Sequence, residues 1–396
     1  EMNIKNLRVG IDLMFIGNPE HVSGIQSHAE DILTGFREIG KLKLCKLYTL
    51  SSCRDYFSKK YPEAEIPLID DRSRIFKKYI LKSYQNFSGR SGSNTMQNLE
   101  MAVYSKKAEK SCDVVLHTFH DNLRSNVIEN VKNIWVFHDL FSQTFAEFSN
   151  KRKSAAKIKY EEYLRNCEAI VTISNFVKND IYSYYPDVDI SNLRVIPNAV
   201  SISNDPSCVE TMKIIDRPYI LNINAIREHK NQITLIKAFQ KIMDDVPHSL
   251  VIVGAPGDVY DDIRCYINDN QMSDRVKILS FISDQEKASL YSGASLFVTT
   301  SLHEGFGRTP IEAAMYRIPV ISSRCDSLPE ATMEMLDYYE PPCDFNVLAL
   351  KIMEVLSKKN DTEKLNLIAE KFQRNYSCRS VAERYWELIE EVCSKP

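Results

Sequence analysis

The sequence lacks several features that would assign it to a familiar class of protein. It has no excess of basic side chains, since 50 Lys and Arg face 53 Asp and Glu for a formal charge of −3. This balance argues against a nucleic acid as the main partner. No apolar run approaches the roughly 20 residues that span a bilayer, and the first residues lack the charged-then-apolar pattern of a signal peptide. We therefore expect a cytoplasmic location with only peripheral contact at the inner face of a membrane.

Further absences concern cofactors. The ten cysteines form no C-x-x-C pair and no cluster with His at zinc-ligand spacing, which favours packed, reduced thiols. No G-x-G-x-x-G follows the first predicted strand, where Gly10 leads only to IDLMFIG, and this argues against a dehydrogenase. His117 and His120 stand at H-x-x-H spacing, but without a third ligand they suit the lining of an acceptor site better than a metal pair. We expect no metal and no organic cofactor.

Short β-branched runs alternate with helical periodicity along the chain of 396 residues. Runs buried on both faces and separated by helices are typical of parallel sheets built from βα units. They form two series, which predict an α/β protein with two Rossmann-like, doubly wound domains. The predicted strands are 8–13, 44–50, 114–117, 134–137, 169–173 and 193–196, then 219–223, 250–253, 276–279, 296–299 and 319–322.

The break between the two series falls within residues 202–218, where Ser, Asn, Asp and Pro interrupt the apolar pattern. We place the domains at residues 1–203 and 204–375, followed by a helix over 376–396. Ligands of open α/β sheets bind beyond the carboxyl ends of the strands. Two such domains facing a central cleft would place a site between them.

The most informative segment is SLHEGFGRTPIEAA at 301–314, directly after a predicted strand. Thr309 as N-cap and Pro310 at the first helical position predict a helix start, which leaves 305–308 as a loop. Backbone N–H groups at such a helix start bind anions, and glycines permit close approach. Glu304 and Glu312 suit the hydroxyls of a sugar ligand. An alternative is a capping box, in which Glu312 only closes the helix that Thr309 begins.

Taken together, these segments resemble the retaining glycosyltransferases of the GT-B fold, in particular glycosyltransferase family 4 (group 1). The E-G-F-G segment is followed by P-x-E with two glutamates at E-x7-E spacing. The other matching segments follow in the family's order: FHD at 137–139, ISNF at 173–176, VIPNAV at 195–200, HKN at 229–231 and SLPE at 327–330.

The resemblance implies an acceptor-binding first domain, a second domain that binds a nucleotide diphosphate sugar, and a C-terminal helix that returns to the first domain. It implies catalytic roles for His138 at the donor sugar, for Lys230 at the diphosphate and for Glu304 at the sugar hydroxyls. Glu312 would hold the ribose. The remaining donor-binding positions are Ser23, Gly24, Arg227, Gly305, Phe306, Gly307, Arg308 and Thr309.

The sequence departs from the family pattern near Lys230. Asn224 stands where Gly is common, Ala225 where Arg is common, and His229 where Arg precedes the lysine. The second cation at the diphosphate is therefore missing from its usual place. Arg227 and Arg308 are the candidates to supply it.

The two halves of the chain differ in charge. Residues 1–200 hold 28 basic against 24 acidic side chains, whereas residues 201–396 hold 22 against 29. The first half contains six cations over 72–90 interleaved with aromatic and aliphatic residues, and residues 151–165 extend the basic character. An anionic membrane surface or a lipid-diphosphate acceptor would select such a stretch. A solvated basic helix is the alternative.

We therefore expect a metal-independent, retaining hexosyltransferase. It would move a hexose or deoxyhexose, of mannose or rhamnose type, from a nucleotide diphosphate sugar to a glycan or lipid-linked acceptor in surface polysaccharide synthesis, for example of lipopolysaccharide. The alternatives are a non-catalytic partner subunit that binds nucleotide sugar, and an epimerase or phosphorylase of the same fold.

Overall fold

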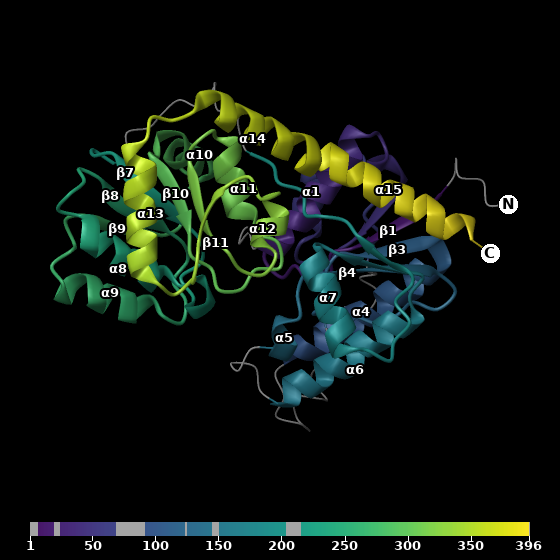
Figure 1. Cartoon of the computed structure of the whole chain (residues 1–396). Coiled ribbons are helices and arrows are strands. Elements are labelled where there is room, and N and C mark those ends of the chain that lie inside the picture. Colours follow the sequence, from purple (N-terminus) through teal and green to yellow (C-terminus); the bar gives the residue numbers. More distant parts are fainter. Residues whose placement is uncertain are drawn as a thin grey trace. The chain divides into compact units, whose positions relative to one another are not determined.

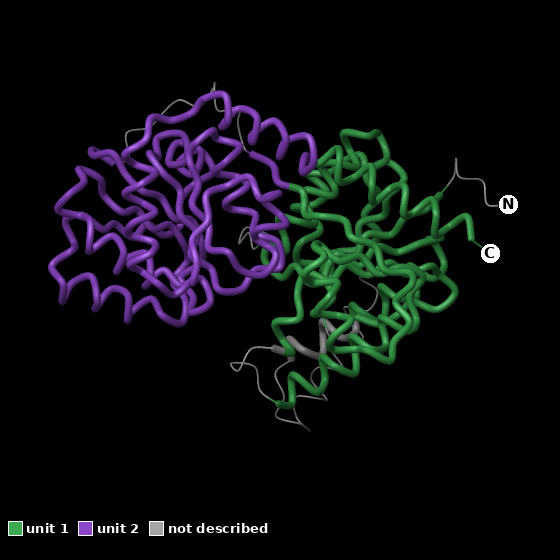
Figure 2. Tube along the Cα trace, in the orientation of Figure 1, with its two compact units in different colours: residues 1–199, 378–396 green, residues 200–377 purple. Residues whose placement is uncertain are grey.

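The computed structural model describes residues 7–19, 24–68, 92–122, 125–144, 150–202 and 215–395. The chain divides into two compact units, one formed by residues 1–199 and 378–396 and the other by residues 200–377 (Figure 2). The division lies close to the boundary expected at residue 203. The C-terminal residues from Cys378 onward belong to the first unit.

Within the described residues, the first unit has one six-stranded parallel sheet in the order β2-β1-β3-β4-β5-β6. Its strands β1, β3 and β4 are labelled in Figure 1. Its strands are β1 (Val9–Asp12), β2 (Cys45–Tyr48), β3 (Val114–His117), β4 (Lys132–Phe137), β5 (Ala169–Thr172) and β6 (Leu193–Val195). Its helices are α1 (Gly24–Glu38), η2 (Leu42–Leu44), α2 (Arg54–Lys60), α4 (Gly92–Ser111), α5 (Phe141–Thr144), α6 (Asn150–Asn166), α7 (Asn175–Tyr184) and α15 (Cys378–Ser394).

The second unit has a six-stranded parallel sheet in the order β12-β11-β10-β7-β8-β9, again counted over the described part of the chain. Its strands are β7 (Tyr219–Ile223), β8 (Ser249–Val253), β9 (Val276–Leu279), β10 (Leu296–Thr299), β11 (Val320–Ser323) and β12 (Asp337–Tyr339). Its helices are η4 (Glu228–Lys230), α8 (Gln232–Ile242), α9 (Tyr260–Asp269), α10 (Asp284–Gly293), α11 (Arg308–Met315), α12 (Leu328–Ala331), α13 (Phe345–Ser357) and α14 (Thr362–Tyr376).

The prediction of two doubly wound α/β domains is confirmed. All eleven predicted strands form, most with the same ends to within one or two residues. The apolar runs of the central strands are buried, as in the four fully buried residues of β10, whereas the edge strands β6 and β9 are partly exposed. The structure adds β12, a three-residue edge strand that the sequence pattern did not predict.

Each sheet contains a point where the strand order reverses direction. In the first unit it lies between β1 and β3, and in the second it lies between β7 and β10. The loops that leave two neighbouring strands at such a point run apart, so a crevice opens beyond the carboxyl ends of those strands, where ligands of open α/β sheets bind. In the second unit a ligand is therefore expected beside the loops after β7 and β10, which carry the HKN and EGFG segments.

Helix α15 packs directly along α1 within the first unit. Gly35 of α1 allows this close approach, since a Cβ atom there would lie 2.2 Å from the carbonyl oxygen of Cys378. The rings of Phe36 and Trp386 meet edge to face at 5.5 Å beside this contact. A helix from the end of the chain thus completes the core of the unit that the start of the chain builds.

Among the helices in the described ranges, none combines the length and the apolar character that a membrane span requires.

Candidate functional site

Lys230 and Glu304 form an ion pair at the reversal point of the second sheet. Lys230 ends the short turn η4 after β7, and Glu304 lies on the loop after β10. The Lys230 Nζ atom lies 2.6 Å from Glu304 Oε1, and the two side chains are 15% and 14% exposed. The two loops are also joined, because the side chain of Thr300 donates through Oγ1 to the Lys230 carbonyl at 2.9 Å. The structure therefore brings together two residues that are 74 positions apart in the sequence.

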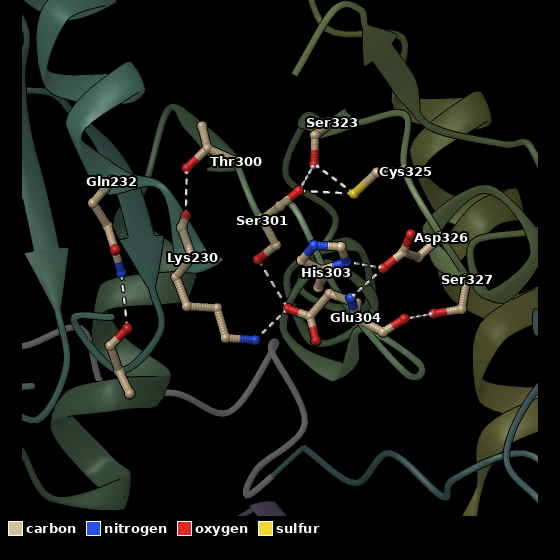
Figure 3. A network of polar contacts seen from close by, with 11 residues as sticks. Lys230, Gln232, Thr300, Ser301, His303, Glu304, Ser323, Cys325, Asp326 and Ser327 are labelled. Carbon is tan, nitrogen blue, oxygen red and sulfur yellow. Dashed lines mark hydrogen bonds and ion pairs between the residues drawn. The ribbon is translucent and has the colours of Figure 1, made fainter. Parts of the chain in front are cut away.

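The loop that follows β11 holds Glu304 from the other side (Figure 3). The backbone N–H of Glu304 donates to Asp326 Oδ2 at 3.1 Å, and Ser327 Oγ donates to the Glu304 carbonyl at 2.7 Å. Ser301 Oγ donates to the same carboxylate oxygen of Glu304 that Lys230 contacts, at 2.9 Å. His303 Nδ1 lies 3.1 Å from Asp326 Oδ2. Glu304 is thus fixed by contacts to its backbone as well as to its carboxylate.

Helix α11 begins two residues earlier than the sequence predicts. Its N-cap is Gly307, with φ of 87° in the left-handed region, and Arg308 is already helical. The predicted Thr309 N-cap is therefore wrong, and the loop consists of residues 305–307 only. A Cβ atom on Gly307 would lie 2.4 Å from Leu328 Cδ2. The glycine is required both by this approach and by the backbone conformation that turns the chain into the helix.

Glu312 does not close a capping box. Its carboxylate, 7% exposed, lies 2.6 Å from Lys287 Nζ and accepts a hydrogen bond from Tyr291 OH at 3.0 Å. Burial alone would raise the pKa of Glu312, but the cations of Lys287 and Arg308 hold it below its usual value. The alternative in which Glu312 serves only the helix start is wrong. The residue is a buried carboxylate with a cation beside it.

Three further basic side chains, Arg227, His229 and Arg308, lie at η4 and at the start of α11. Arg227 precedes η4 and is exposed. His229 is partly buried, and burial together with the cation of Lys230 lowers its pKa to about 4. It is therefore a neutral imidazole at pH 7. Arg308 begins α11 and acts electrostatically on Glu312. Two arginines thus remain candidates for the second cation: Arg227, which is exposed before η4, and Arg308 at the start of α11.

The ring of Phe306 belongs to the core of the second unit. It is buried, and it meets the ring of Tyr376 edge to face at 5.3 Å. Gly305 and Thr309 lie on either side of Gly307 and are partly exposed. The segment therefore offers backbone N–H groups and small side chains rather than an aromatic surface.

In the first unit, His138 directly follows β4 and is only 5% exposed. Its Nε2 atom lies 2.9 Å from the carbonyl oxygen of Thr118, and its backbone N–H donates to His120 Nδ1 at 3.3 Å. The carbonyl partner requires the hydrogen on Nε2 of His138. Gly24 begins α1 with open space around the position of a Cβ atom, whereas Ser23 lies outside the described residues.

The H-x-x-H pair does not line a surface. His117 is fully buried, its Nδ1 lies 2.9 Å from Asp12 Oδ2, and its Nε2 lies 3.1 Å from Asn133 Oδ1. Both ring nitrogens are therefore occupied, so the expected acceptor-side role is wrong for His117. No group of three or more His, Cys, Asp or Glu side chains that could hold a metal occurs in the part of the chain that the structure describes.

The basic stretch over 72–90 lies outside the described residues, and the structure does not test its expected contact with a membrane. The second basic stretch coincides with α6, where several cations have acidic neighbours. Arg152 pairs with Asp121 at 2.7 Å, and Arg165 pairs with Glu161 at 2.7 Å. This part of the basic character is locally compensated.

Sequence patterns did not reveal the partners of the two glutamates. Asp326, Ser301 and Ser327 contact Glu304, and Lys287 with Tyr291 contacts Glu312. The only available signal was that Asp326 follows a predicted strand and directly precedes the SLPE segment, of which Ser327 is the first residue. Which loops face each other depends on the strand order, which a single sequence does not state.

Two family models match the chain in succession. The model described as "Glycosyltransferase Family 4" matches residues 67–204, and "Glycosyl transferases group 1" matches residues 211–372. The second match contains every residue of the Lys230–Glu304–Asp326 network and the pair around Glu312. One model therefore matches a part of the first unit, and the other matches most of the second unit.

Curated relatives match over part of their length. An O-antigen chain mannosyltransferase of Salmonella typhimurium, RfbU, is 33% identical over 160 residues, which are 40% of this chain and 43% of the relative. O-antigen chain mannosyltransferase B of Escherichia coli is 24% identical over 56% of this chain and 61% of its own length. The chain thus spans between about two fifths and three fifths of these two relatives.

Solved structures match over nearly the whole chain. A glycosyltransferase from Rickettsia africae has a TM-score of 0.69 at 17% identity and covers 99% of this chain and all of its own. Anabaena Alr3699/HepE, solved with UDP and glucose, has a TM-score of 0.70 at 15% identity and covers 97% of this chain and all of its own. At these identities the likeness concerns the fold, which is GT-B.

Proposed function

Because the chain belongs to the group 1 glycosyltransferases of family 4, we propose that it is a retaining hexosyltransferase that uses a nucleotide diphosphate sugar. The proposed sugar is mannose or a related deoxyhexose such as rhamnose, and the proposed acceptor is a glycan or lipid-linked glycan in surface polysaccharide synthesis. Two relatives named as O-antigen chain mannosyltransferases support this choice. Peripheral contact with an anionic membrane belongs to the same proposal.

One observation carries the proposal: the Lys230–Glu304 pair lies at the reversal point of the second sheet, beside the start of α11. A cation and a helix N-terminus together suit a diphosphate. A carboxylate beside them suits the hydroxyls of the sugar that the diphosphate carries. In the structure the two side chains neutralise each other. We propose that Lys230 turns to the diphosphate and Glu304 to the sugar when the donor binds.

The remaining site residues take the roles that their positions allow. The backbone N–H groups of residues 305–309 would meet the sugar and diphosphate, and Arg227 or Arg308 would add a second cation. Glu312 would hold the ribose hydroxyls, with Lys287 shared between the carboxylate and the ligand. From the first unit, the proposal assigns His138 to the donor sugar and the segment around Ser23 and Gly24 to phosphate or acceptor.

The proposed reaction proceeds on one face of the donor sugar. The bond between the anomeric carbon and the phosphate oxygen breaks, a bond from that carbon to the acceptor oxygen forms, and the departing phosphate oxygen takes the acceptor proton. Negative charge grows on the leaving group, so Lys230 and the N–H groups stabilise the transition state more than the ground state. This division of labour requires no metal, and we expect transfer to persist with a chelator present.

Two other functions would use the same donor site. A non-catalytic partner subunit would bind nucleotide sugar without turnover, and an epimerase or phosphorylase would give a different product. The joint presence of Glu304, Glu312, Lys230 and His138 favours a transferase over a binding subunit. NMR analysis of the product separates the rest, since retention at the anomeric carbon with a new glycosidic bond is expected of the proposed enzyme.

The proposal is tested with a panel of GDP, UDP and dTDP sugars. A thermal-shift screen first identifies the nucleotide, since a ligand that binds only the native state raises its apparent stability. Transfer is then measured for the wild type, for Glu304→Gln, and for Glu363→Gln as a control at an exposed position of α14. We expect Glu304→Gln to lose transfer and Glu363→Gln to keep it. Undiminished transfer by Glu304→Gln would remove Glu304 from its role.

A further inference from the structure

Asp326 contributes the only carboxylate that contacts the backbone of Glu304 among the described residues. It lies on the loop after β11, and its carboxylate oxygen Oδ2 accepts from two donors, the Glu304 N–H at 3.1 Å and His303 Nδ1 at 3.1 Å. Its side chain is 16% exposed. A charged acceptor makes stronger hydrogen bonds than a neutral one. One side chain therefore ties two consecutive residues of the loop after β10 to the neighbouring strand.

The other contacts between the two segments are made at Ser301 and at Glu304 of the same loop. Ser323 Oγ and Cys325 Sγ both donate to the carbonyl oxygen of Ser301, at 2.7 Å and 2.8 Å (Figure 3). Ser327 Oγ donates to the Glu304 carbonyl at 2.7 Å. Side chains of residues 323–327 thus donate hydrogen bonds to the backbone carbonyls of Ser301 and Glu304, the two ends of the segment 301–304. This arrangement follows from the sheet order, because β10 and β11 are neighbours whose carboxyl ends meet at one edge.

The backbone of Asp326 is specialised for this contact. Its φ of 47° lies in the left-handed region, which non-glycine residues seldom adopt. Asp and Asn tolerate this region better than most side chains do. Glycine would adopt the conformation with less strain but would carry no carboxylate. The residue at this position therefore combines a backbone that suits glycine with a side chain that glycine lacks.

Two kinds of contact hold Glu304, and they differ in what donor binding would do to them. The contact of Lys230 is made to the carboxylate, and on the proposed function Lys230 turns from there to the diphosphate. The contacts of Asp326 and Ser327 are made to the backbone. These contacts can persist when the carboxylate of Glu304 takes a new partner.

We infer that Asp326 is a positioning residue for Glu304, which keeps the backbone of the loop in place while the Glu304 carboxylate exchanges Lys230 for the donor sugar. This inference rests on the proposed function for its effect on transfer, but its physical basis is the hydrogen bond to the Glu304 N–H. His303 shares the carboxylate and limits the freedom of Asp326 to rotate away from that bond.

The conformation of Asp326 supplies a clean test. Asp326→Gly removes the carboxylate and keeps the backbone conformation, whereas Asp326→Asn keeps an oxygen acceptor at the same place. Gln271→Gly is the matched control, since Gln271 is also left-handed, with φ of 56°, and is exposed after α9. If Asp326→Gly should fail to fold, Asp326→Ala, which also removes the carboxylate, replaces it in both measurements with the same expected results.

The first measurement is hydrogen exchange of the peptide that contains residues 301–306. We expect the Glu304 amide to exchange at least about tenfold faster in Asp326→Gly, and near the wild-type rate in Asp326→Asn and Gln271→Gly. This measurement needs no substrate. If the Glu304 amide exchanges faster in Asp326→Gly but the wild type transfers no sugar, the proposed function is refuted and the positioning role of Asp326 is supported. An unchanged rate in Asp326→Gly would overturn the inference.

The second measurement is transfer, with kcat and KM separated. Displacement of a catalytic group by about 1 Å lowers the rate by roughly 10²-fold, so we expect such a fall in kcat for Asp326→Gly. The affinity for the nucleoside diphosphate alone should be unchanged, because Glu304 contacts only the sugar. Asp326→Asn should stay within about threefold of the wild type. If Asp326 acts through Glu304, adding Asp326→Gly to Glu304→Gln should cause little further loss, and a fully additive loss would overturn the inference.

Discussion

Gly307→Ala is expected to destabilise the second unit more than an ordinary surface substitution does. The methyl group would lie 2.4 Å from Leu328 Cδ2, and Leu328 is fully buried. The ordinary separation of carbon atoms is about 3.5–4.0 Å, so Leu328 or α11 must move, and such overpacking costs about 1–3 kcal/mol. The φ of 87° adds about 1–2 kcal/mol for a residue that carries a Cβ atom. The sum is a loss of about 2–5 kcal/mol.

The assay exploits the position of the tryptophans. Both of them, Trp135 and Trp386, belong to the first unit, so their fluorescence reports its unfolding, whereas circular dichroism reports both units. Urea unfolding of Gly307→Ala should shift the circular dichroism transition more than the fluorescence transition. Gly40→Ala is the control, since Gly40 has φ of 70° but no atom within 4 Å of the added methyl group. A loss for Gly307→Ala no larger than that for Gly40→Ala would refute the steric part of the reasoning.

Three further outcomes test other parts of the structure. Lys287→Met removes the cation beside Glu312. Because the pKa of Glu312 is lowered in the folded protein, the ionised carboxylate stabilises the fold, and this stabilisation is lost as pH falls through that pKa. Without the cation of Lys287 the pKa is lowered less, so the loss of stability should begin at a higher pH. Urea midpoints measured against pH test this. Burial lowers the pKa of His229 to about 4 in the folded protein. The unfolded chain, with an ordinary His pKa of about 6.5, takes up a proton first, so the free energy of unfolding falls as the pH drops from about 6.5 to about 4. His229→Gln should lack this part of the slope. Gly35→Ala, whose methyl group would lie 2.2 Å from the Cys378 carbonyl oxygen, should lower the stability of the first unit by about 1–3 kcal/mol in tryptophan fluorescence. Gly24→Ala, with open space around it, should change that stability by less than about 0.5 kcal/mol.

The sheets were predictable because their central strands, such as β4 and β10, are buried and so read as continuous apolar runs. The strand β12 escaped prediction because its residues, Asp-Tyr-Tyr, include an acidic side chain and no aliphatic one, so they form no apolar run. The start of α11 was misplaced because Thr309 and Pro310 form a typical N-cap pair, whereas the structure begins the helix after Gly307, whose left-handed φ turns the chain two residues earlier. Leu328 leaves no room for a Cβ atom at Gly307, so the position requires glycine.

Residues of the candidate site could be named from the sequence where they lie in segments that resemble the family, as Lys230 does in HKN and Glu304 in EGFG. Lys230 and Glu304 were both predicted, and the structure joins them by a bond of 2.6 Å. Their remaining neighbours were not predictable, because Asp326 and Lys287 reach the glutamates from other loops and helices. These contacts arise from the strand order β11-β10-β7 and from the packing of α10, which depend on long-range pairing.

The return of the chain to its first unit has a consequence for protein engineering. The second unit is one unbroken stretch, residues 200–377, and the Val200 N–H donates to the Tyr376 carbonyl at 2.7 Å. Its entry and exit are therefore hydrogen-bonded neighbours, which is the geometry of a domain inserted into a host. The stretch can be exchanged as a cassette between relatives, and a short flexible linker can close the host in its place. If the proposed function holds, chimeras joined at 199/200 and 377/378 would show which unit determines the choice of sugar and which the choice of acceptor.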